Sequence, residues 1–301
     1  MNVSRLSVLT SALSVGLMAP ARKAEHTWAS SFGFGALAGA LSKTATAPLD
    51  RLRLVQQTTA SATQGHAAGA RAMLRSDGAL GLWRGNGLAV VKGTMTKGIL
   101  LASQDALSRK LGSDAAAGSI AGLLAHGPTY PLDVLRTRIA ASVGQAPRAV
   151  LPLALSVVRR EGILALYRGA GATAGGAIFF EGVRFGLFGR LRERADGTGT
   201  LTGALPAWLA PALCGAAASL VAGVLLYPND TIRRRLQYGR REGGALEAGY
   251  MATARALVRE GGIARLFRGL PLYCAKAGPA AAVQFGCYDC LKRLLPPRES
   301  G

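Results

Sequence analysis

The sequence is short of acidic residues and of charge in general. Its 301 residues hold 16 Asp plus Glu against 36 Lys plus Arg, a formal net charge of +20, and only 17% of them are charged. Soluble domains carry roughly 25% charged residues, so this content points away from a soluble domain. A basic excess in a soluble chain would instead be typical of nucleic-acid binding. A membrane protein and a basic nucleic-acid binder therefore compete at the outset.

Cysteine is scarce, and one common phosphate-binding motif is missing. The four cysteines Cys214, Cys274, Cys287 and Cys290 all fall in apolar segments, which favours core packing over a redox role and implies no disulfide framework. The chain has no G-x-x-x-x-G-K-[ST] run, which argues against an ATP-driven pump or a P-loop enzyme. We expect no enzyme, no metal and no organic cofactor.

Several stretches of the chain lack charge almost completely. Residues 201–229 hold no charged side chain, and His126 is the only residue in 115–132 that titrates near neutral pH. Spanning a bilayer core of roughly 30 Å takes about 20 apolar helical residues. Four further apolar segments hold one or a few charges each, near residues 30–56, 86–108, 169–190 and 269–293. A central Lys or Arg costs roughly 2.5–3.5 kcal/mol in lipid, so these charges make sense around a shared aqueous cavity. A soluble all-helical protein is the alternative.

What is present is a threefold repeat, anchored at Pro48, Pro131 and Pro228. In each copy an acid follows the proline by two residues and an arginine follows it by five. Small residues precede each proline by thirteen and nine positions, a spacing that lets helices approach closely in lipid. They are Gly35 and Gly39, Gly118 and Gly122, and Gly215 and Ser219. Internal repetition at this period decides the fold.

A second motif follows in every copy. An acid–Gly pair precedes an aromatic–Arg–Gly turn, and the third copy has one extra residue, Gly262, between the acid and the arginine. Each unit therefore predicts a long helix bent at proline, a short amphipathic helix, a turn and a second long helix. The predicted units are 28–112, 113–200 and 201–295, with an extension at 1–27 that is either a targeting segment or a tail, and a C-terminal tail at 296–301.

The two motifs together resemble the mitochondrial carrier family over roughly residues 28–295. The resemblance implies an all-α membrane protein with six transmembrane helices in three tandem pseudo-symmetric repeats, each with a short amphipathic helix on the matrix side. It also implies a multi-pass protein of the mitochondrial inner membrane, or of a plastid or peroxisome, that works as a monomer by alternating access. Val55 departs from the signature, because it stands where Arg138 and Arg235 supply a second base.

In the family, the signature acids and bases close the matrix side in pairs between neighbouring repeats. The implied pairs here are Asp50 with Arg136, Asp133 with Arg233, and Asp230 with Arg53. Gln57 and Gln237 stand at positions where the family braces such pairs with glutamine, whereas the third such position is Ala140. Three unrelated surface ion pairs of roughly 0–1 kcal/mol each are the alternative.

The resemblance also implies a gate on the cytoplasmic side, and it is less complete here. Tyr288, Asp289 and Lys292 fit its aromatic-acid-x-x-base pattern, but Ser108 stands where a base is expected. The residues that remain for this gate are Asp105, Arg109, Arg192, Tyr288, Asp289 and Lys292. We therefore expect the weaker gate on this side and a preference for opening to it.

The aromatic–Arg–Gly turns precede helices, whose free N–H groups favour phosphate. In the family these turns hold cardiolipin, which would give that role to Trp83, Arg84, Gly85, Tyr167, Arg168, Gly169, Phe267, Arg268 and Gly269. A turn with only a structural role is the alternative. Anionic lipid is thus an expected partner, and nucleic acid is not.

Charges within the spans are the candidate solute ligands. Bases outnumber acids among them, which suits an anion. The candidates are Lys43, Lys92, Lys97, Glu181, Arg184 and Lys276, with Gly176 and Ala177 where related adenine-nucleotide carriers place a small pair. Packing or snorkelling is an alternative for Lys97 and Arg184. Glu181 stands where the ADP/ATP carrier has an arginine, so a strict ADP/ATP exchanger is not expected.

Three functional hypotheses follow. The first is a carrier of a nucleotide, coenzyme A or a related phosphorylated anion. The second is a carrier of a carboxylate or an amino acid, which a contact between Glu181 and a solute amine would favour. The third is a protein without transport activity, either a membrane scaffold or a nucleic-acid binder. The sequence decides neither the exact solute nor exchange against uniport.

Overall fold

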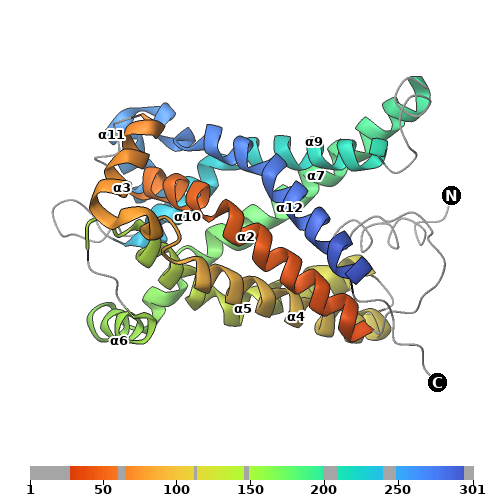
Figure 1. Ribbon diagram of the computed structural model, residues 1–301, viewed down its shortest axis with the longest axis horizontal. Helices are drawn as coiled ribbons and strands as arrows, with labels where there is room; N and C mark the ends of the chain where they lie inside the picture. The colour runs from red at the N-terminus through yellow and green to blue at the C-terminus, as the bar shows by residue number, and fades with distance from the viewer. Residues whose placement is uncertain are drawn as a thin grey trace.

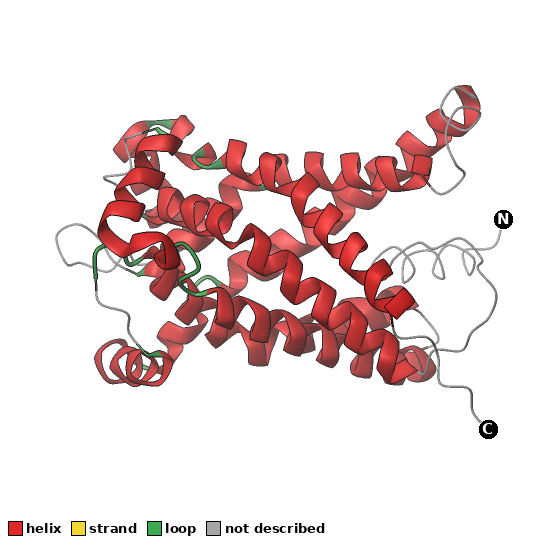
Figure 2. Ribbon diagram, in the orientation of Figure 1, coloured by secondary structure: helices red, strands yellow, loops and turns green. Residues whose placement is uncertain are grey.

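The structure is a computed structural model that describes residues 28–59, 65–111, 114–145, 149–198, 209–239 and 249–294. Within these residues the chain is helical and has no strand (Figure 2). The predicted terminal segments 1–27 and 296–301 lie outside the described residues. The long helices are α2 (Trp28–Thr58), α4 (Asn86–Leu111), α5 (Asp114–Ala141), α7 (Ala170–Thr198), α9 (Leu209–Leu225) and α12 (Leu270–Leu294), and α10 (Tyr227–Tyr238) follows α9 after a break.

Helices of neighbouring repeats pack against each other in a ring. The second long helix of each repeat lies on the first long helix of the next: α4 on α5, α7 on α9, and α12 on α2. Figure 1 shows α12 and α2 side by side although they stand at opposite ends of the chain. The last contact joins the third repeat to the first, so the all-α fold closes on itself.

The short helices lie at the end of the ring where the signature motifs are. They are α3 (His66–Gly81), α6 (Val150–Glu161) and α11 (Tyr250–Gly261), and the 3-10 turns η1 (Ile163–Tyr167) and η2 (Ile263–Phe267) follow the last two. Helices α6 and α11 each bury the residues of one stripe, Leu153 with Val157 and Thr253 with Leu257, and leave the opposite side exposed. This is the amphipathic pattern of a helix that covers a core from one side.

The prolines act differently in the three repeats. Pro48 lies inside α2, and Pro131 lies inside α5 together with Pro128. In the third repeat the helix breaks at Leu226, and α9 and α10 meet at 59°. A proline removes one backbone hydrogen bond and clashes with the preceding turn. The prediction of one bent helix in every repeat is therefore corrected for repeat 3, where two helices replace it.

The small residues that pack closely are not those that the sequence indicated. A side chain added at Gly35 or Gly122 would meet no neighbouring atom within 4 Å. The buried small residues lie three positions farther along each helix, again four apart: Ala38 and Ser42, Ala121 and Ala125, and Ala218 and Ala222. Ser42 Oγ donates a 2.7 Å hydrogen bond to the Ala280 carbonyl of α12. Both sets repeat threefold, so spacing alone did not tell which side faces the neighbouring helix.

The extra residue in the third repeat is accommodated in its short helix. Gly78, Gly162 and Gly262 adopt positive φ values of 72°, 83° and 67°, a conformation that favours glycine. Each of the three precedes the arginine of the following turn by six residues. Gly262, and not Gly261, is therefore the equivalent of the other two, and α11 ends one residue later than the pattern suggested.

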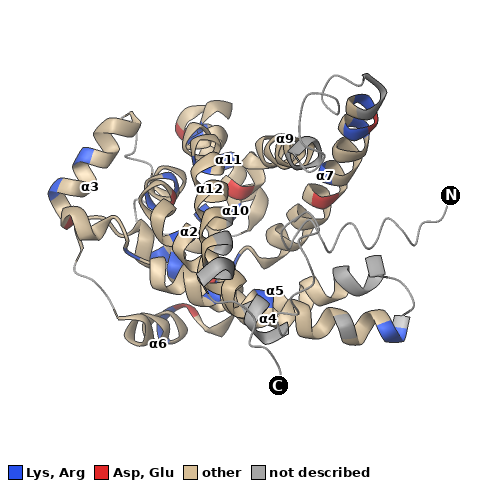
Figure 3. Ribbon diagram, turned by 45° about the vertical axis from the view of Figure 1, so that its right-hand side comes forward, with Lys and Arg blue, Asp and Glu red and all other residues tan. Residues whose placement is uncertain are grey.

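Length and hydropathy alone would find fewer spans than the fold contains. One described stretch, Ile163–Ala195, is long and apolar enough to pass as a membrane span, and the bent pair Leu213–Leu225 with Tyr227–Tyr238 passes as a second. The other long helices carry charges that such a test penalises, and Lys and Arg are spread over them (Figure 3).

Candidate functional site

The signature acids and bases meet in a closed set of pairs, which we call the signature ring: Asp50, Arg53, Asp133, Arg136, Asp230 and Arg233. Arg53 donates to Asp230 at 2.7 Å, Arg136 lies 3.6 Å from Asp50, and Arg233 donates to Asp133. Each pair joins two neighbouring repeats. The pairing that the resemblance implied is therefore present in the structure.

Two of the three pairs are braced by additional hydrogen bonds. Gln237 Nε2 donates to Asp133 Oδ2 and to Tyr130 Oη, both at 3.0 Å, so that it ties the pair between repeats 2 and 3 to a tyrosine. Gln57 Nε2 donates to Asp230 at 3.1 Å, and Arg53 Nε donates to Tyr227 Oη at 3.3 Å. Tyr130 and Tyr227 directly precede the signature prolines, and each donates to the carbonyl of a turn arginine.

The third pair, between repeats 1 and 2, has neither brace. Ala140 stands at the glutamine position and Ala47 at the tyrosine position. Lys276 of repeat 3 takes their place, since its Nζ donates to both carboxylate oxygens of Asp50 at 2.7 and 2.8 Å. The closest partner of Asp50 is thus a predicted solute ligand and not the signature arginine.

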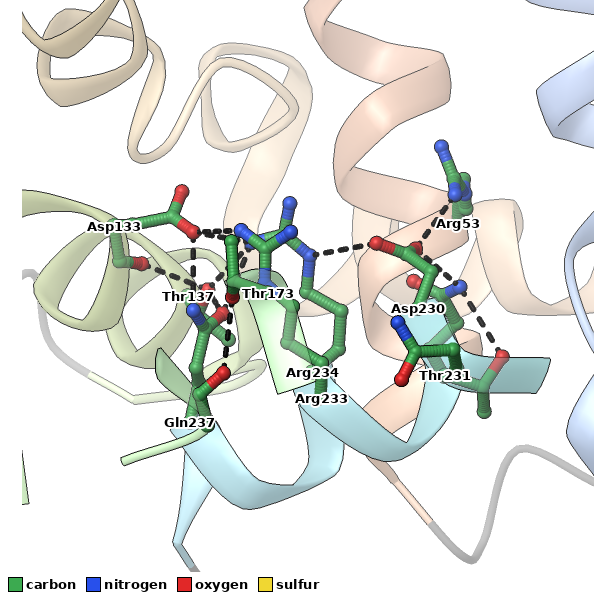
Figure 4. A network of polar contacts seen from close by, with 12 residues as sticks. Arg53, Asp133, Thr137, Thr173, Asp230, Thr231, Arg233, Arg234 and Gln237 are labelled. Atoms are coloured by element: carbon green, nitrogen blue, oxygen red, sulfur yellow. Dashed lines mark hydrogen bonds and ion pairs between the residues drawn. The ribbon is translucent and has the colours of Figure 1, made fainter. Parts of the chain in front are cut away.

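Arg234 joins two of the pairs, although it is not among the predicted site residues. Its Nη1 lies 3.3 Å from Asp133 and its Nε 3.8 Å from Asp230, so that it stands between two acids of the ring (Figure 4). Nη1 also donates to Gln237 Oε1 at 3.0 Å. The run of three arginines, Arg233 to Arg235, was the available signal. This run occurs in one repeat only, so aligning the three repeats with one another gives no signal for Arg234.

A second set of arginines connects each short helix to the next repeat. Arg138 donates to Glu161 of its own repeat and, at 3.1 Å, to the Gln237 carbonyl of repeat 3. Arg235 likewise donates to Glu260 and to the Thr58 carbonyl of repeat 1. These carbonyls end helices, where backbone acceptors have no partner within the helix. Each arginine therefore caps a neighbouring helix while it holds its own loop.

Repeat 1 keeps this connection although it lacks the arginine. Val55 occupies the position and packs with Leu52 and Met73. Arg51, one helical turn earlier, donates to Asp77 of its own repeat at 2.5 Å and to the Ala140 carbonyl of repeat 2 at 3.0 Å. Both side chains of this pair are 1% exposed. The irregularity at Val55 is thus a relocation of the base and not its loss.

The candidate solute ligands fall into two groups by their partners. Lys92 and Lys276 reach acids of the signature ring: Lys92 Nζ lies 2.8 Å from Asp133 Oδ1, although this oxygen accepts no hydrogen bond from the described residues. Lys43 Nζ donates instead to the Ala89 carbonyl of α4 at 2.9 Å. A Cβ at Gly93 would lie 1.8 Å from that nitrogen, so the glycine leaves the space that Lys43 occupies.

The remaining candidates lie apart from the ring. Glu181 accepts a 2.9 Å hydrogen bond from Arg184 Nε on the same helix, and the Arg184 guanidinium stacks over Phe185. This internal pairing neutralises the acid that would bind a solute amine. Gly176 faces Asn229, whose Nδ2 would lie 2.2 Å from a Cβ there, whereas Ala177 is exposed. Lys97 is exposed and lies beside Gly39.

Positive charge exceeds negative charge around the ring. Three acids face six bases within 4 Å, namely Arg53, Lys92, Arg136, Arg233, Arg234 and Lys276. Asp133, which is fully buried, is surrounded by three of these bases. Acids and bases so close in a partly buried site hold each other in place, and the excess of bases favours a multiply charged anion as a further ligand.

Comparison with known proteins agrees with this geometry. A family model described as "Mitochondrial carrier protein" matches residues 24–115, 108–197 and 206–299. The chain belongs to the mitochondrial carrier family. The three matches cover the three repeats, and the all-α carrier fold follows from them together with the helical ring.

Individual carriers in the comparison share about 30% of their residues with this one. "Mitochondrial adenyl nucleotide antiporter SLC25A25" of Homo sapiens is 32% identical over 272 residues, 87% of this chain and 58% of its own length. "Calcium-binding mitochondrial carrier protein SCaMC-2" of Bos taurus is 31% identical with the same coverage. "Mitochondrial substrate carrier family protein P" of Dictyostelium discoideum is 30% identical over 91% of this chain and 96% of its own length. The chain thus spans less than two thirds of the first two relatives.

The aromatic–Arg–Gly turns of this carrier pack against the backbone of the signature-ring arginines. Gly85, Gly169 and Gly269 have φ values of 84°, 80° and 84°, and a Cβ at each would lie 3.4 Å from a ring arginine carbonyl. Trp83, Tyr167 and Phe267 are exposed, whereas Arg84 and Arg168 donate within the protein, to Gln145 and Glu161. Arg268 contributes its carbonyl to Tyr227. The aromatic rings, not the guanidinium groups of Arg84 and Arg168, are therefore the parts turned outward.

The opposite gate is only partly covered by the structure. The backbones of Asp105, Tyr288, Asp289 and Lys292 lie in α4 and α12, but their side chains lie outside the described residues. Arg109 and Arg192 are described, and both take part in interactions. The prediction of a weaker gate on this side stays a prediction.

Proposed function

We propose that this carrier exchanges a small phosphorylated anion, a nucleotide or coenzyme A, across the mitochondrial inner membrane by alternating access. The excess of bases over acids at the signature ring is the observation that carries the proposal. A di- or triphosphate supplies several negative charges in a compact group, and charge-assisted hydrogen bonds to Lys and Arg recognise such groups. The name of the human relative, an adenyl nucleotide antiporter, points to the same class.

The signature ring would serve as the matrix gate in this cycle. With its three pairs formed, the ring holds the repeats together at the end where the short helices lie. Ion pairs can exchange for water and for solute, so the closed state need be favoured by only a few kcal/mol. Gln57 and Gln237 would strengthen two of the three pairs. The side chains of Asp105, Arg109, Arg192, Tyr288, Asp289 and Lys292 would then form the gate to the cytoplasm.

The turns that follow the short helices would bind anionic lipid, with cardiolipin as the family precedent. The exposed rings of Trp83, Tyr167 and Phe267 suit the membrane interface, where amphipathic aromatics accumulate. The backbone N–H groups that begin α4, α7 and α12 suit lipid phosphate. We further propose that the carrier works as a monomer, because the three repeats close the ring within one chain.

A carboxylate or amino-acid carrier is the second candidate. Its best support in the sequence was Glu181, and the pairing of Glu181 with Arg184 weakens that support for an amine-bearing solute. A polycarboxylate remains compatible with the basic excess. A scaffold without transport is the third candidate, and the two sets of inter-repeat arginine contacts are compatible with it.

The test is uptake by purified carrier in cardiolipin-containing liposomes. Vesicles are preloaded with one solute, and uptake of labelled ATP, ADP, AMP, coenzyme A, phosphate or a dicarboxylate is followed. We expect uptake of a nucleotide or of coenzyme A, and only when a counter-solute is inside. Dicarboxylate uptake alone would replace the proposed solute class, and uptake without an internal solute would replace exchange by uniport. A carrier shown to be folded that transports none of them would favour the scaffold.

A further inference from the structure

In repeats 2 and 3 a hydrogen bond joins the bent part of the chain to the aromatic–Arg–Gly turn of the same repeat. The bent part supplies the donor there: Tyr130 Oη donates to the Arg168 carbonyl at 2.9 Å, and Tyr227 Oη donates to the Arg268 carbonyl at 2.8 Å. Repeat 1 has Ala47 at the tyrosine position, and alanine has no side-chain donor. This hydrogen bond between helix and turn therefore cannot form in repeat 1.

In repeat 1 the turn supplies the donor and the helix supplies the acceptor. Trp83 Nε1 donates to the Thr44 carbonyl of α2 at 2.8 Å. Within an α-helix this carbonyl would accept from the N–H of the residue four positions later. That residue is Pro48, which has no N–H, and a backbone acceptor without a partner is costly in a membrane span. The indole N–H thus replaces the hydrogen bond that the signature proline removes.

A second hydrogen bond holds the same residue of α2. Asn86, the first residue of α4, donates from Nδ2 to Thr44 Oγ1 at 2.9 Å, and Thr44 Oγ1 donates to the Ala40 carbonyl at 2.8 Å. Only repeat 1 has a hydroxyl, an indole and an amide at these three positions. The residues that correspond to Thr44, Trp83 and Asn86 are Gly127, Tyr167 and Ala170 in repeat 2, and Val224, Phe267 and Leu270 in repeat 3. The three groups thus occur in the repeat that lacks the tyrosine.

The two kinds of hydrogen bond differ in their surroundings. Tyr130 and Tyr227 are 3% and 1% exposed, and each also accepts a hydrogen bond from a residue of the signature ring or its glutamine brace. In contrast, Thr44 is exposed and Trp83 is 39% exposed. Repeat 1 therefore joins its helix to its turn at the surface, whereas repeats 2 and 3 do so beside the signature ring.

We infer that Trp83 is a positioning residue of the proposed matrix gate: its indole N–H fixes the course of α2 at Pro48, and with it the place of Asp50. Helix α2 continues unbroken through this proline, and Asp50 follows it by two residues. A change of direction at Pro48 would therefore shift Asp50 relative to Arg136, which lies 3.6 Å away. The role in gating rests on the proposed function, whereas the hydrogen bond does not depend on it.

Lipid binding by the aromatic ring is a separate property, and Trp83→Phe distinguishes the two. Phenylalanine keeps an aromatic ring at the turn, as Phe267 does in repeat 3, but it has no donor for the Thr44 carbonyl. A role in lipid binding alone would survive this substitution. A role that depends on the N–H group would not.

The first experiment is thermal unfolding of the purified carrier in detergent, with and without added cardiolipin. We expect Trp83→Phe to lower the melting temperature by about 2–4 °C, because one hydrogen bond is lost, and by the same amount in both detergents. Tyr167→Phe is the matched control, since it removes one polar hydrogen from the turn of repeat 2 while Tyr130 keeps the hydrogen bond to that turn. A loss that appears only with cardiolipin, or equal losses in the two variants, would overturn the inference.

The second experiment asks whether the N–H of Trp83 replaces that of residue 48. Pro48→Ala gives α2 its own donor for the Thr44 carbonyl, so Trp83→Phe should cost less stability in that background than in the wild type. Thr44→Val is the comparison, because it removes the hydroxyl but keeps the carbonyl, and Trp83→Phe should cost as much there as in the wild type. Equal costs in the Pro48→Ala and wild-type backgrounds would show that only the bulk of Trp83 matters.

A spectroscopic measurement covers the case in which Pro48→Ala does not fold. Trp28→Phe and Trp208→Phe together leave Trp83 as the single tryptophan of the chain. The ultraviolet resonance Raman spectrum of this variant reports whether the indole N–H is hydrogen-bonded. We expect the spectrum of a bonded N–H, and the spectrum of a free N–H would overturn the inference.

The role in gating is tested by ATP exchange in preloaded liposomes that contain cardiolipin. We expect Trp83→Phe to lower the maximal rate about fivefold, which corresponds to about 1 kcal/mol, and to leave KM unchanged, because Trp83 contacts its own repeat and not the solute ligands. A wild-type rate in a destabilised Trp83→Phe carrier would overturn the role in the gate. If the wild-type carrier exchanges no ATP, the proposed solute class is wrong, and the unfolding experiments still decide whether the hydrogen bond holds α2.

Discussion

The interface between repeats 2 and 3 and the interface between repeats 1 and 2 use the same signature and hold it in different ways. At the first, Asp133 is fully buried among two arginines, one lysine and a glutamine. At the second, Asp50 is 17% exposed, and its partner from repeat 2, Arg136, lies 3.6 Å away, whereas its closest partner, Lys276, comes from repeat 3. The comparison shows that the acid and the base of a motif determine which residues form an ion pair. The side chains outside the motif determine how stable each ion pair is.

The largest expected effect separates these two acids. Asp133→Asn keeps the shape of the side chain but leaves Arg233 and Lys92 without their acid and Arg234 with Asp230 alone, and removing one partner of a buried pair costs about 3–5 kcal/mol. Asp50→Asn should cost about 1–2 kcal/mol, because its pair is partly exposed. Unfolding of the solute-free carrier, followed by tryptophan fluorescence, measures both. Equal losses would show that the difference in burial has no energetic meaning.

The next effect concerns the relocated arginine of repeat 1. Arg51→Ala leaves Asp77 buried without its closest base and the Ala140 carbonyl without a donor, and we expect a loss of about 3 kcal/mol. Asp77→Ala combined with Arg51→Ala should lose less than the sum of the two single variants, because neither member of this closest pair is then left buried without its partner. Thermal unfolding measures all three, with Arg71→Ala, an exposed arginine of α3, as the control for lost charge. If the losses of stability in the two single variants add up in the double variant, Arg51 and Asp77 do not interact directly.

A smaller effect is expected from removing the glutamine brace at the interface between repeats 2 and 3, which would then resemble the unbraced interface between repeats 1 and 2. Gln237→Ala removes the hydrogen bonds to Asp133 and Tyr130 and leaves Arg234 with one acceptor fewer, so we expect a loss of about 1–3 kcal/mol. Gln57→Ala is the matched variant at the interface between repeats 3 and 1, and it should cost less because Gln57 makes fewer contacts. Denaturant unfolding compares the two. A Gln237→Ala protein as stable as the wild type would refute the brace.

How far the sequence predicted this site depends on whether a feature repeats. The acid–arginine pairs of the ring were predicted, since the same spacing occurs three times and the family resemblance supplied the partners. Arg234 was missed because it occurs once. The partner of Lys276 could not be predicted, because it depends on where α12 lies against α2. Repetition also misled in one place: two small-residue sets share the same spacing, and only packing shows that Ala38 and Ser42, not Gly35 and Gly39, are buried.

The same limit applies to the arginines that cap neighbouring helices. Val55 was read as a loss from the signature, because a motif assigns a role to a position. The structure assigns the role to Arg51, since a base one helical turn away lies on the same side of the helix and reaches the same acid. A departure from a motif is thus informative only after neighbouring turns have been searched for the missing group.

The smallest expected effect tests the arginine contacts outside the membrane spans. Hydrogen bonds and charge from Arg138, and then charge from Arg168, hold the pKa of Glu161 below its usual 4.5 although partial burial opposes them. A carboxyl whose pKa is lower in the folded than in the unfolded state stabilises the protein above pH 4.5, and this contribution disappears as the pH falls through the folded-state pKa. Glu161→Gln should therefore lower the melting temperature at pH 7 and converge with the wild type in acid. Arg138→Gln should flatten the same difference, and a gap between wild type and Glu161→Gln that stays constant from pH 7 down to acid would show that Glu161 is not held by Arg138.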